Sequence, residues 1–471
     1  MMYATRSAIK AAGGIGIAAV MFSVAVFGLA ALAENSDSSV VKEKISEAFR
    51  LSEIQYPGNW DINDKRGIDT FTDCLALDVS MHYREQLPMD TFDSRVYLFP
   101  VAAANEPVHH ACDELFYVFS HPELATSVKE HSYFRYWWGS AVVARIALGI
   151  TGLSVGGYRH LIQILSFVAL GIFILTFFYS FGRTAAVFMP LFLSILLGYG
   201  MLTLGQSIAH APEFIVGLFM LSAYSLGNVQ RRSRLTRALW YSFLGSACVY
   251  FDLLNANVAA IEILLCCQLT APYVSRLLRG QDELSPAPAA ILKEIIENSA
   301  YVLIGGFLAI VIRIVGYSFA SHTSILDAIS AWLSDLAYRV SGSLDDIYPG
   351  QTIQPSLHRL FTTLKGNRHQ PFHGFLSTQL ADAFYALGFL SWAAVLPLCW
   401  VLHKKAVPYL GALLGLVSAA SLVPAWFLLF EQHTIIHAWM TGRLMSLFFG
   451  LGMSLALLLG LSVLQKRSYP R

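Results

Sequence analysis

Long apolar stretches recur along the whole chain, and they restrict its fold more than any other feature of the sequence. Hydrophobic residues make up 55% of the 471 positions, and only 13% of the positions are charged. A soluble domain of this length could not bury so much apolar surface, so the sequence predicts an all-α polytopic membrane protein. Hydropathy places about ten transmembrane helices, at roughly these residues: 12–33, 160–180, 184–204, 212–228, 238–252, 257–271, 298–319, 382–402, 406–429 and 443–465.

Lysine and arginine gather in the loops on one side of this topology, and this sets its orientation. With ten spans and a cytoplasmic N-terminus, every short loop rich in these residues is cytoplasmic. The segment "WWGSAVVARIALGITG" (residues 137–152) is also apolar, but it is short and contains Arg145. A full span there would put the later basic loops outside, including "RRSRLTR" (residues 231–237), and an arginine in mid-membrane is costly. We therefore expect residues 137–152 to form a helix at the membrane interface.

This topology predicts a single membrane-embedded domain over residues 1–471, with two large exported segments. The first span could also be a cleaved signal peptide, because "ALAE" (Ala31 to Glu34) resembles a cleavage site. Its apolar core exceeds the usual signal length, which favours a retained anchor. The expected parts are the anchor 12–33, an extracytoplasmic loop 34–159 with interfacial helices, transmembrane helices 2–7 in 160–319, a second extracytoplasmic loop 320–381, and transmembrane helices 8–10 in 382–471.

The first exported loop contains paired acids in "RGIDTFTDCLALD" (residues 66–78). On a helix, Asp69 and Asp73 would be four residues apart and share a face. Two such carboxylates can provide a general base or hold a divalent cation, and the plainer interpretation is a solvated acidic face. Cys74 and Cys112 lie in the same polar region and could form a disulfide if it is exported to an oxidising compartment.

Aromatic and basic residues follow in "HSYFRYWWG" (residues 131–139). Such a cluster suits the lipid headgroup zone, where Trp and Tyr anchor and Arg meets phosphate. A simple aromatic belt is the alternative. Arg159, at the outer start of the second predicted span, could extend a phosphate site.

Two further polar groups interrupt apolar sequence. In "YFDLLNAN", Asp252 lies between two predicted spans, where a carboxylate is expensive unless it serves a function or sits in an outer turn. In "FEQHTIIHAWMTGR" (residues 430–443), His433 and His437 share a helical face and precede Arg443. The histidines could bind a divalent metal with a third ligand from elsewhere, or donate hydrogen bonds to phosphate. A polar loop with a snorkelling arginine is the plainer interpretation.

Several function classes find no support. The net charge is +1, so no basic field indicates nucleic acid. The sequence has no phosphate-binding glycine loop after a strand, no GxSxG elbow and no CxxC pair.

The order of these motifs resembles that of the GT-C class of integral-membrane glycosyltransferases. Within this class, it is most similar to that of poorly characterised bacterial polytopic proteins. The likeness covers most of the chain through "IDTFTDCLALD", "YFRYWWGSAVVARIAL", "YFDLLNAN" and "HTIIHAWMTGR". It implies an enzyme of the bacterial inner membrane that takes a sugar from a polyprenyl-phosphate-linked donor and attaches it to a glycan, lipid or protein on the periplasmic side. No cofactor is certain, and a divalent metal is possible.

The resemblance also implies roles for residues. Asp73 or Asp69 would be the general base on the acceptor hydroxyl, and basic residues near the outer leaflet would hold the departing phosphate. The candidate substrate-binding residues are His131, Arg135, Tyr136, Trp137, Arg159, Asp252, His433, His437 and Arg443.

Two other functions compete with sugar transfer. A transporter or lipid flippase would place polar groups near mid-bilayer and often show inverted repeats. The sequence shows no repeat, and its predicted polar groups lie at one face, which favours an enzyme. An acyl- or phosphate-group transferase would instead centre its chemistry on His433 or His437.

Overall fold

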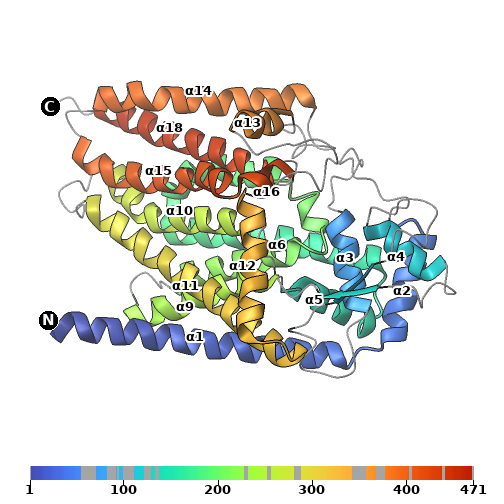
Figure 1. Ribbon diagram of the computed structural model, residues 1–471. Helices are drawn as coiled ribbons and strands as arrows, with labels where there is room; N and C mark the ends of the chain where they lie inside the picture. The colour runs from blue at the N-terminus through green and yellow to red at the C-terminus, as the bar shows by residue number, and fades with distance from the viewer. Residues whose placement is uncertain are drawn as a thin grey trace.

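The protein is a bundle of long helices with a group of short helices at one end (Figure 1). The computed structural model describes residues 2–54, 70–81, 92, 95–98, 111–120, 129–132, 137–227, 232–251, 256–279, 288–341, 357–366, 377–402, 406–436 and 441–468. The long helices are α1 (Met2–Glu34), α6 (Val155–Phe181), α8 (Ala211–Leu226), α9 (Arg234–Phe251), α10 (Ala256–Leu278), α11 (Pro288–Ser321), α14 (Thr378–Leu402), α15 (Ala406–Leu429) and α18 (Leu444–Ser468).

Within the described residues, seven helical stretches are long and apolar enough to cross a membrane. Many large apolar side chains of these helices face outward, including Val24 on α1 and Phe389 on α14. An outward apolar surface on long helices is what a lipid environment requires. The prediction of a helical polytopic membrane protein is therefore confirmed at this level.

The exact count of ten spans stays a prediction, because three of them have no long apolar helix of their own. The predicted span 184–204 is not one continuous helix. Gly182 ends α6 with a φ of 58°, a backbone conformation that glycine adopts without steric cost. The broken run that follows consists of the 3-10 helix η3 (Gly182–Phe188), α7 (Met189–Leu193), the π-helix η4 (Ser194–Gly198) and the 3-10 helix η5 (Leu204–Gln206). Helix α8 is a shorter apolar helix of 16 residues, and α9 has 18.

Helices α1, α9 and α11 run in the same direction. The Arg234 guanidinium donates to Ser7 near the start of α1, and Ser242 Oγ donates to the Tyr301 carbonyl in α11. Glycine permits the close approach of α9 and α11, because a Cβ on Gly245 would overlap the backbone of the facing helix. The basic start of α9 therefore lies at the same end of the bundle as the N-terminus, which fits the predicted alternation of loops.

Short elements at the other end form a region that we call the cap. It consists of α2 (Ser38–Arg50), α3 (Thr70–Met81), α4 (Ala111–Ser120), α5 (Gly139–Gly149), and the antiparallel strands β1 (Arg95–Leu98) and β2 (Lys129–Ser132). The cap lies where α1 ends, at the right in Figure 1. These two short strands depart from the all-helical expectation. The possible disulfide is confirmed, since Cys74 and Cys112 are bonded and join α3 to α4.

Arg145 is buried in the cap and binds α5 to the ends of neighbouring helices. Its side chain is only 2% exposed. It donates to the carbonyls of Ala33 (2.9 Å), Ser80 (2.9 Å) and Ser36 (3.0 Å), which lie at the ends or flanks of other helices. Helix ends leave such carbonyls without intrahelical donors. Most of α5 is therefore buried inside the cap, and its expected position at the membrane interface stays a prediction.

Three more helices lie at the cap end of the bundle. They are α12 (Ile325–Ser341), α13 (Leu357–Gly366) and α16 (Glu431–Ile436). Both α12 and α13 pack against α16, which contains part of the predicted histidine motif. Two helices of the second predicted exported segment therefore lie against the C-terminal histidine motif.

Candidate functional site

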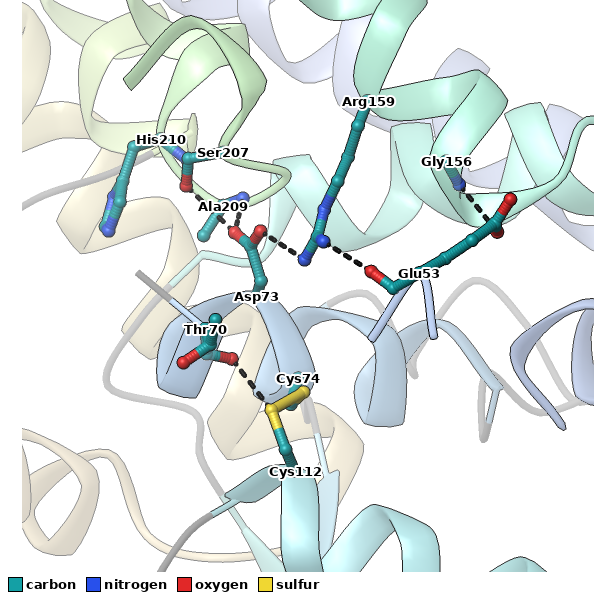
Figure 2. A network of polar contacts seen from close by, with 10 residues as sticks. All are labelled: Glu53, Thr70, Asp73, Cys74, Cys112, Gly156, Arg159, Ser207, Ala209 and His210. Carbon is teal, nitrogen blue, oxygen red and sulfur yellow. Dashed lines mark hydrogen bonds and ion pairs between the residues drawn. A yellow bond between two sulfur atoms is a disulfide. The ribbon is translucent and has the colours of Figure 1, made fainter. Parts of the chain in front are cut away.

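A buried ion pair links the cap to the helix bundle. Asp73 on α3 is 0% exposed and Arg159 on α6 is 6% exposed. The Arg159 Nη2 atom lies 3.0 Å from the Asp73 Oδ2 atom (Figure 2). Two candidates from separate sequence motifs thus meet. A buried carboxylate and guanidinium need each other, because either charge alone would be strongly penalised in this environment.

The second oxygen of Asp73 binds the segment before α8. Ser207 Oγ donates to Asp73 Oδ1 at 2.8 Å, and the Ala209 backbone N–H donates to the same atom at 3.1 Å. Figure 2 shows this segment arching over the carboxylate, with His210 beside it. Asp73 therefore holds three structural elements together: α3, α6 and the turn that leads into α8.

Glu53 extends the network along the start of α6. Its backbone carbonyl accepts from Arg159 Nη1 at 2.8 Å. Its carboxylate accepts from the Gly156 N–H at 2.8 Å (Figure 2). It also accepts from Ser154 Oγ at 3.0 Å. An acid at a helix N-terminus accepts hydrogen bonds from free N–H groups, and its negative charge interacts favourably with the positive end of the helix dipole. No sequence motif points to Glu53, although Ser154 is a recognisable N-cap residue before an apolar run.

A chain of hydrogen bonds leads from this network to Arg443. The His210 carbonyl accepts from Asn257 Nδ2 at 3.0 Å, and Asn257 Oδ1 accepts from the Tyr199 hydroxyl at 2.7 Å. The Tyr199 carbonyl in turn accepts from Arg443 Nη1 at 3.4 Å. Gly200 allows this approach, since it has a φ of 82° and a Cβ there would lie 3.0 Å from Arg443 Nη1. The acidic motif and the C-terminal motif thus reach one connected polar region.

The α16 segment adds further buried polar groups beside Arg443. His433 is 4% exposed and Arg443 is 3% exposed. Gln432 and Thr434 are both 0% exposed, and within the described part of the chain the Gln432 amide atoms and the Thr434 hydroxyl have no hydrogen-bond partner. Buried polar groups usually have such partners. These side chains can therefore offer hydrogen bonds to a polar ligand.

Known proteins do not identify the chain. No family model, curated protein or solved structure matches it.

Trp137 has a structural position outside the polar network. Its Nε1 donates to the Ala309 carbonyl of α11 at 3.1 Å, and the Arg313 Cζ atom lies 4.9 Å from its ring centroid. The ring also packs against Phe22 of α1 and Tyr250 of α9. Trp137 thus anchors the cap to the three helices α1, α9 and α11.

The structure leaves other candidates untested. His131 lies on β2, and Asp69, Arg135, Tyr136, Asp252 and His437 lie outside the described residues. The described residues contain no group of three or more His, Cys, Asp or Glu side chains that could hold a metal ion. The divalent metal therefore stays a prediction.

Glu114 on α4 is a titratable group of the cap that the sequence analysis did not select. Burial raises the pKa of its carboxyl to about 7, and the neighbouring Asp113 adds to this rise. It follows Cys112, whose disulfide fixes α4 against α3. Its titration near neutral pH makes the cap sensitive to pH.

Proposed function

We propose that this chain is a membrane glycosyltransferase of the GT-C type, which transfers a sugar from a polyprenyl-phosphate-linked donor to an extracytoplasmic acceptor. One observation carries the proposal: Asp73, Arg159 and Arg443 are buried in one connected polar region at one end of an apolar bundle. Glycosyl transfer to a hydroxyl needs a base for the proton and positive charge for the departing phosphate. A lipid donor would present its phosphate at the depth of a bundle end.

Asp73 and Asp69 have different roles in this proposal. The Asp73 carboxylate already accepts hydrogen bonds from Arg159, Ser207 and Ala209. It is therefore a positioning residue that fixes Arg159 and the turn before α8. Asp69, four residues earlier in sequence, is the proposed general base.

The reaction then proceeds as a single displacement. The Asp69 carboxylate takes the proton of the acceptor hydroxyl, whose oxygen attacks the anomeric carbon. The bond from that carbon to the phosphate oxygen breaks, and the lipid phosphate leaves with its electron pair. Arg443 stabilises the added negative charge, since a guanidinium keeps its charge and binds phosphate oxygens well.

Two features support an orientation with the cap outside the cytoplasm. The Cys74–Cys112 disulfide lies in the cap, and disulfides form in oxidising compartments. Basic residues such as Arg234 and Arg237 start α9 at the opposite end, as the positive-inside rule expects for the cytoplasmic face. We propose that the protein lies in a bacterial inner membrane with its site facing the periplasm.

A transfer assay tests this function. The purified chain in lipid nanodiscs would be given radiolabelled sugars on polyprenyl phosphate together with envelope acceptors. We expect label to move to an acceptor and free polyprenyl phosphate to be released in equal amount. Full retention of label on every lipid donor tested, with the protein folded, would contradict the proposal.

A transporter or flippase is the second candidate, and one observation favours it. Glu262 on α10 lies along a membrane-spanning helix, as polar groups of transporters do. A flippase would move the intact lipid-linked sugar across a vesicle membrane without cleaving the sugar–phosphate bond. Release of polyprenyl phosphate distinguishes the two functions.

A further inference from the structure

Helix α10 places a carboxylate inside the membrane-spanning part of the bundle. Glu262 follows the start of α10 at Ala256 by six residues (262 − 256), a rise of about 9 Å. Its partner Ser299 lies ten residues (299 − 289) into the span that begins at Ala289, a rise of about 15 Å. Because the hydrocarbon core is about 30 Å thick, both side chains lie at membrane depth.

The surroundings of Glu262 are nearly free of charge. Ser299 Oγ donates a hydrogen bond to Glu262 Oε1, and this joins α10 to α11. The titratable groups near it are the thiols of Cys248 on α9 and Cys266 on α10, and α8 brings Glu213 close to the same Cys248 thiol. Among the described residues, no lysine, arginine or histidine forms an ion pair with Glu262.

Helix α11 carries a second buried polar group one residue before Ser299. Asn298 precedes Ser299 on α11 and is 0% exposed. Neither its side-chain oxygen nor its nitrogen has a hydrogen-bond partner in the described part of the chain. Apolar residues would pack this position at lower cost, so polar groups here indicate a use.

An ionised carboxylate with one hydroxyl partner is strongly unfavourable in such surroundings. The group becomes neutral by holding a proton or by binding a metal cation. Hard cations take six or more oxygen ligands. Glu262, Ser299 and Asn298 supply at most a few of these, so a proton fits the available groups better.

We propose that Glu262 is a proton-binding site inside the helix bundle, with Ser299 as its hydrogen-bond partner. When the carboxylate binds a proton, its charge disappears and the Ser299 hydroxyl accepts or donates within the neutral pair. When the proton leaves, the negative charge returns and Ser299 donates to it. This site is separate from the Asp73 network and does not depend on the sugar-transfer proposal.

Dicyclohexylcarbodiimide is a suitable probe, because it reacts with protonated carboxyl groups in apolar surroundings. The full chain in nanodiscs would be treated at pH 7, and peptide masses would locate the adduct. We expect a single main adduct on Glu262, formed at least tenfold faster than on exposed acids such as Glu43. The position is read from the unaltered chain, so the result does not depend on the folding of a variant.

Two variants sharpen the test. Glu262→Gln should abolish this adduct, while Glu294→Gln, the same change near the start of α11, should leave it unchanged. No adduct on Glu262 between pH 5 and pH 8 would overturn the proposal. Complete protection of Glu262 by sodium or potassium at constant pH would also overturn it and assign the site to a metal cation.

Discussion

Arg159 and Asp73 are separated by 86 residues in sequence, yet their side chains form an ion pair of 3.0 Å that the rest of the protein encloses. Removing one partner of such a pair leaves a buried charge without compensation, at a cost of about 3–5 kcal/mol. We expect Asp73→Asn and Arg159→Gln each to lower the free energy of unfolding by about 3 kcal/mol.

The double variant tests the pairing itself. Because it removes both charges, Asp73→Asn with Arg159→Gln should lose clearly less stability than the sum of the single changes. Thermal or denaturant unfolding in detergent would measure all three variants. Strict additivity would show that the two side chains do not interact in the folded protein.

Asp69→Asn separates chemistry from folding. If Asp69 is the general base, the amide cannot take the proton, and sugar transfer should fall at least 100-fold. The melting temperature and donor binding should stay close to those of the unaltered chain. Glu47→Gln on α2 is the control, since its ion pairs with Lys44 and Arg50 are partly exposed and contribute little. Transfer at the normal rate by Asp69→Asn would remove this residue from the mechanism.

Arg443→Ala should weaken binding of polyprenyl phosphate at least tenfold, because charged hydrogen bonds to phosphate contribute about 1.5–3 kcal/mol. Arg183→Ala, at an exposed position near the end of α6, is the matched control and should bind normally. Titration of nanodisc-embedded protein with polyprenyl phosphate, followed by native mass spectrometry, gives both affinities. Equal affinities for the two variants would exclude Arg443 from the phosphate site.

Glu114 gives the cap a defined pH dependence. Its carboxyl has a pKa of about 7 in the folded protein against an ordinary value of 4.5, so the folded state holds the proton more tightly. Stability from this group is therefore full below about pH 4.5, falls as the pH rises toward 7, and stays low above it. Glu114→Gln should raise the free energy of unfolding by about 1–2 kcal/mol at pH 8, after allowance for partial exposure, and change it little at pH 4.5. A gain of equal size at both pH values would assign the effect to packing.

The disulfide should contribute strongly to the cap. Cys74 and Cys112 enclose a sequence separation of 38, for which loop-closure entropy gives a stabilisation of about 4 kcal/mol. Changing both cysteines to alanine should lower the unfolding midpoint, and reduction of the unaltered chain should reproduce this loss. Unchanged unfolding after verified reduction would show that the bond does not restrain the unfolded state.

Hydropathy predicted the long helices because lipid-facing helices need continuous apolar sequence. It could not resolve the run 182–206, since short 3-10, α and π segments have the same composition as one long helix. It also passed over Glu262, a single acid within the apolar run of α10. In both cases tertiary contacts, not local composition, decide the structure.

The candidate site was predictable only in part. Asp73, Arg159, His433 and Arg443 stood out as polar residues at the ends of apolar runs, and the structure places all four in buried positions at the cap end. The connections between them pass through Asn257, which ends the "YFDLLNAN" motif, and through Ser207 and Tyr199, which are ordinary residues in sequence. Trp137 was selected by the same rule and lies at an aromatic anchor between the cap and three helices, so its role as a substrate contact stays a prediction.

The hydrogen bond of Arg145 to the end of α1 can form only after the chain has been synthesised as far as Arg145. Its acceptor Ala33 precedes it by 112 residues. At about 5–20 residues per second, a ribosome needs roughly 6–22 s to add that stretch. During this interval the first helix is already synthesised, while the side chain that binds its far end does not yet exist. Premature release of the nascent chain in that window would leave the end of α1 without the hydrogen bonds of Arg145.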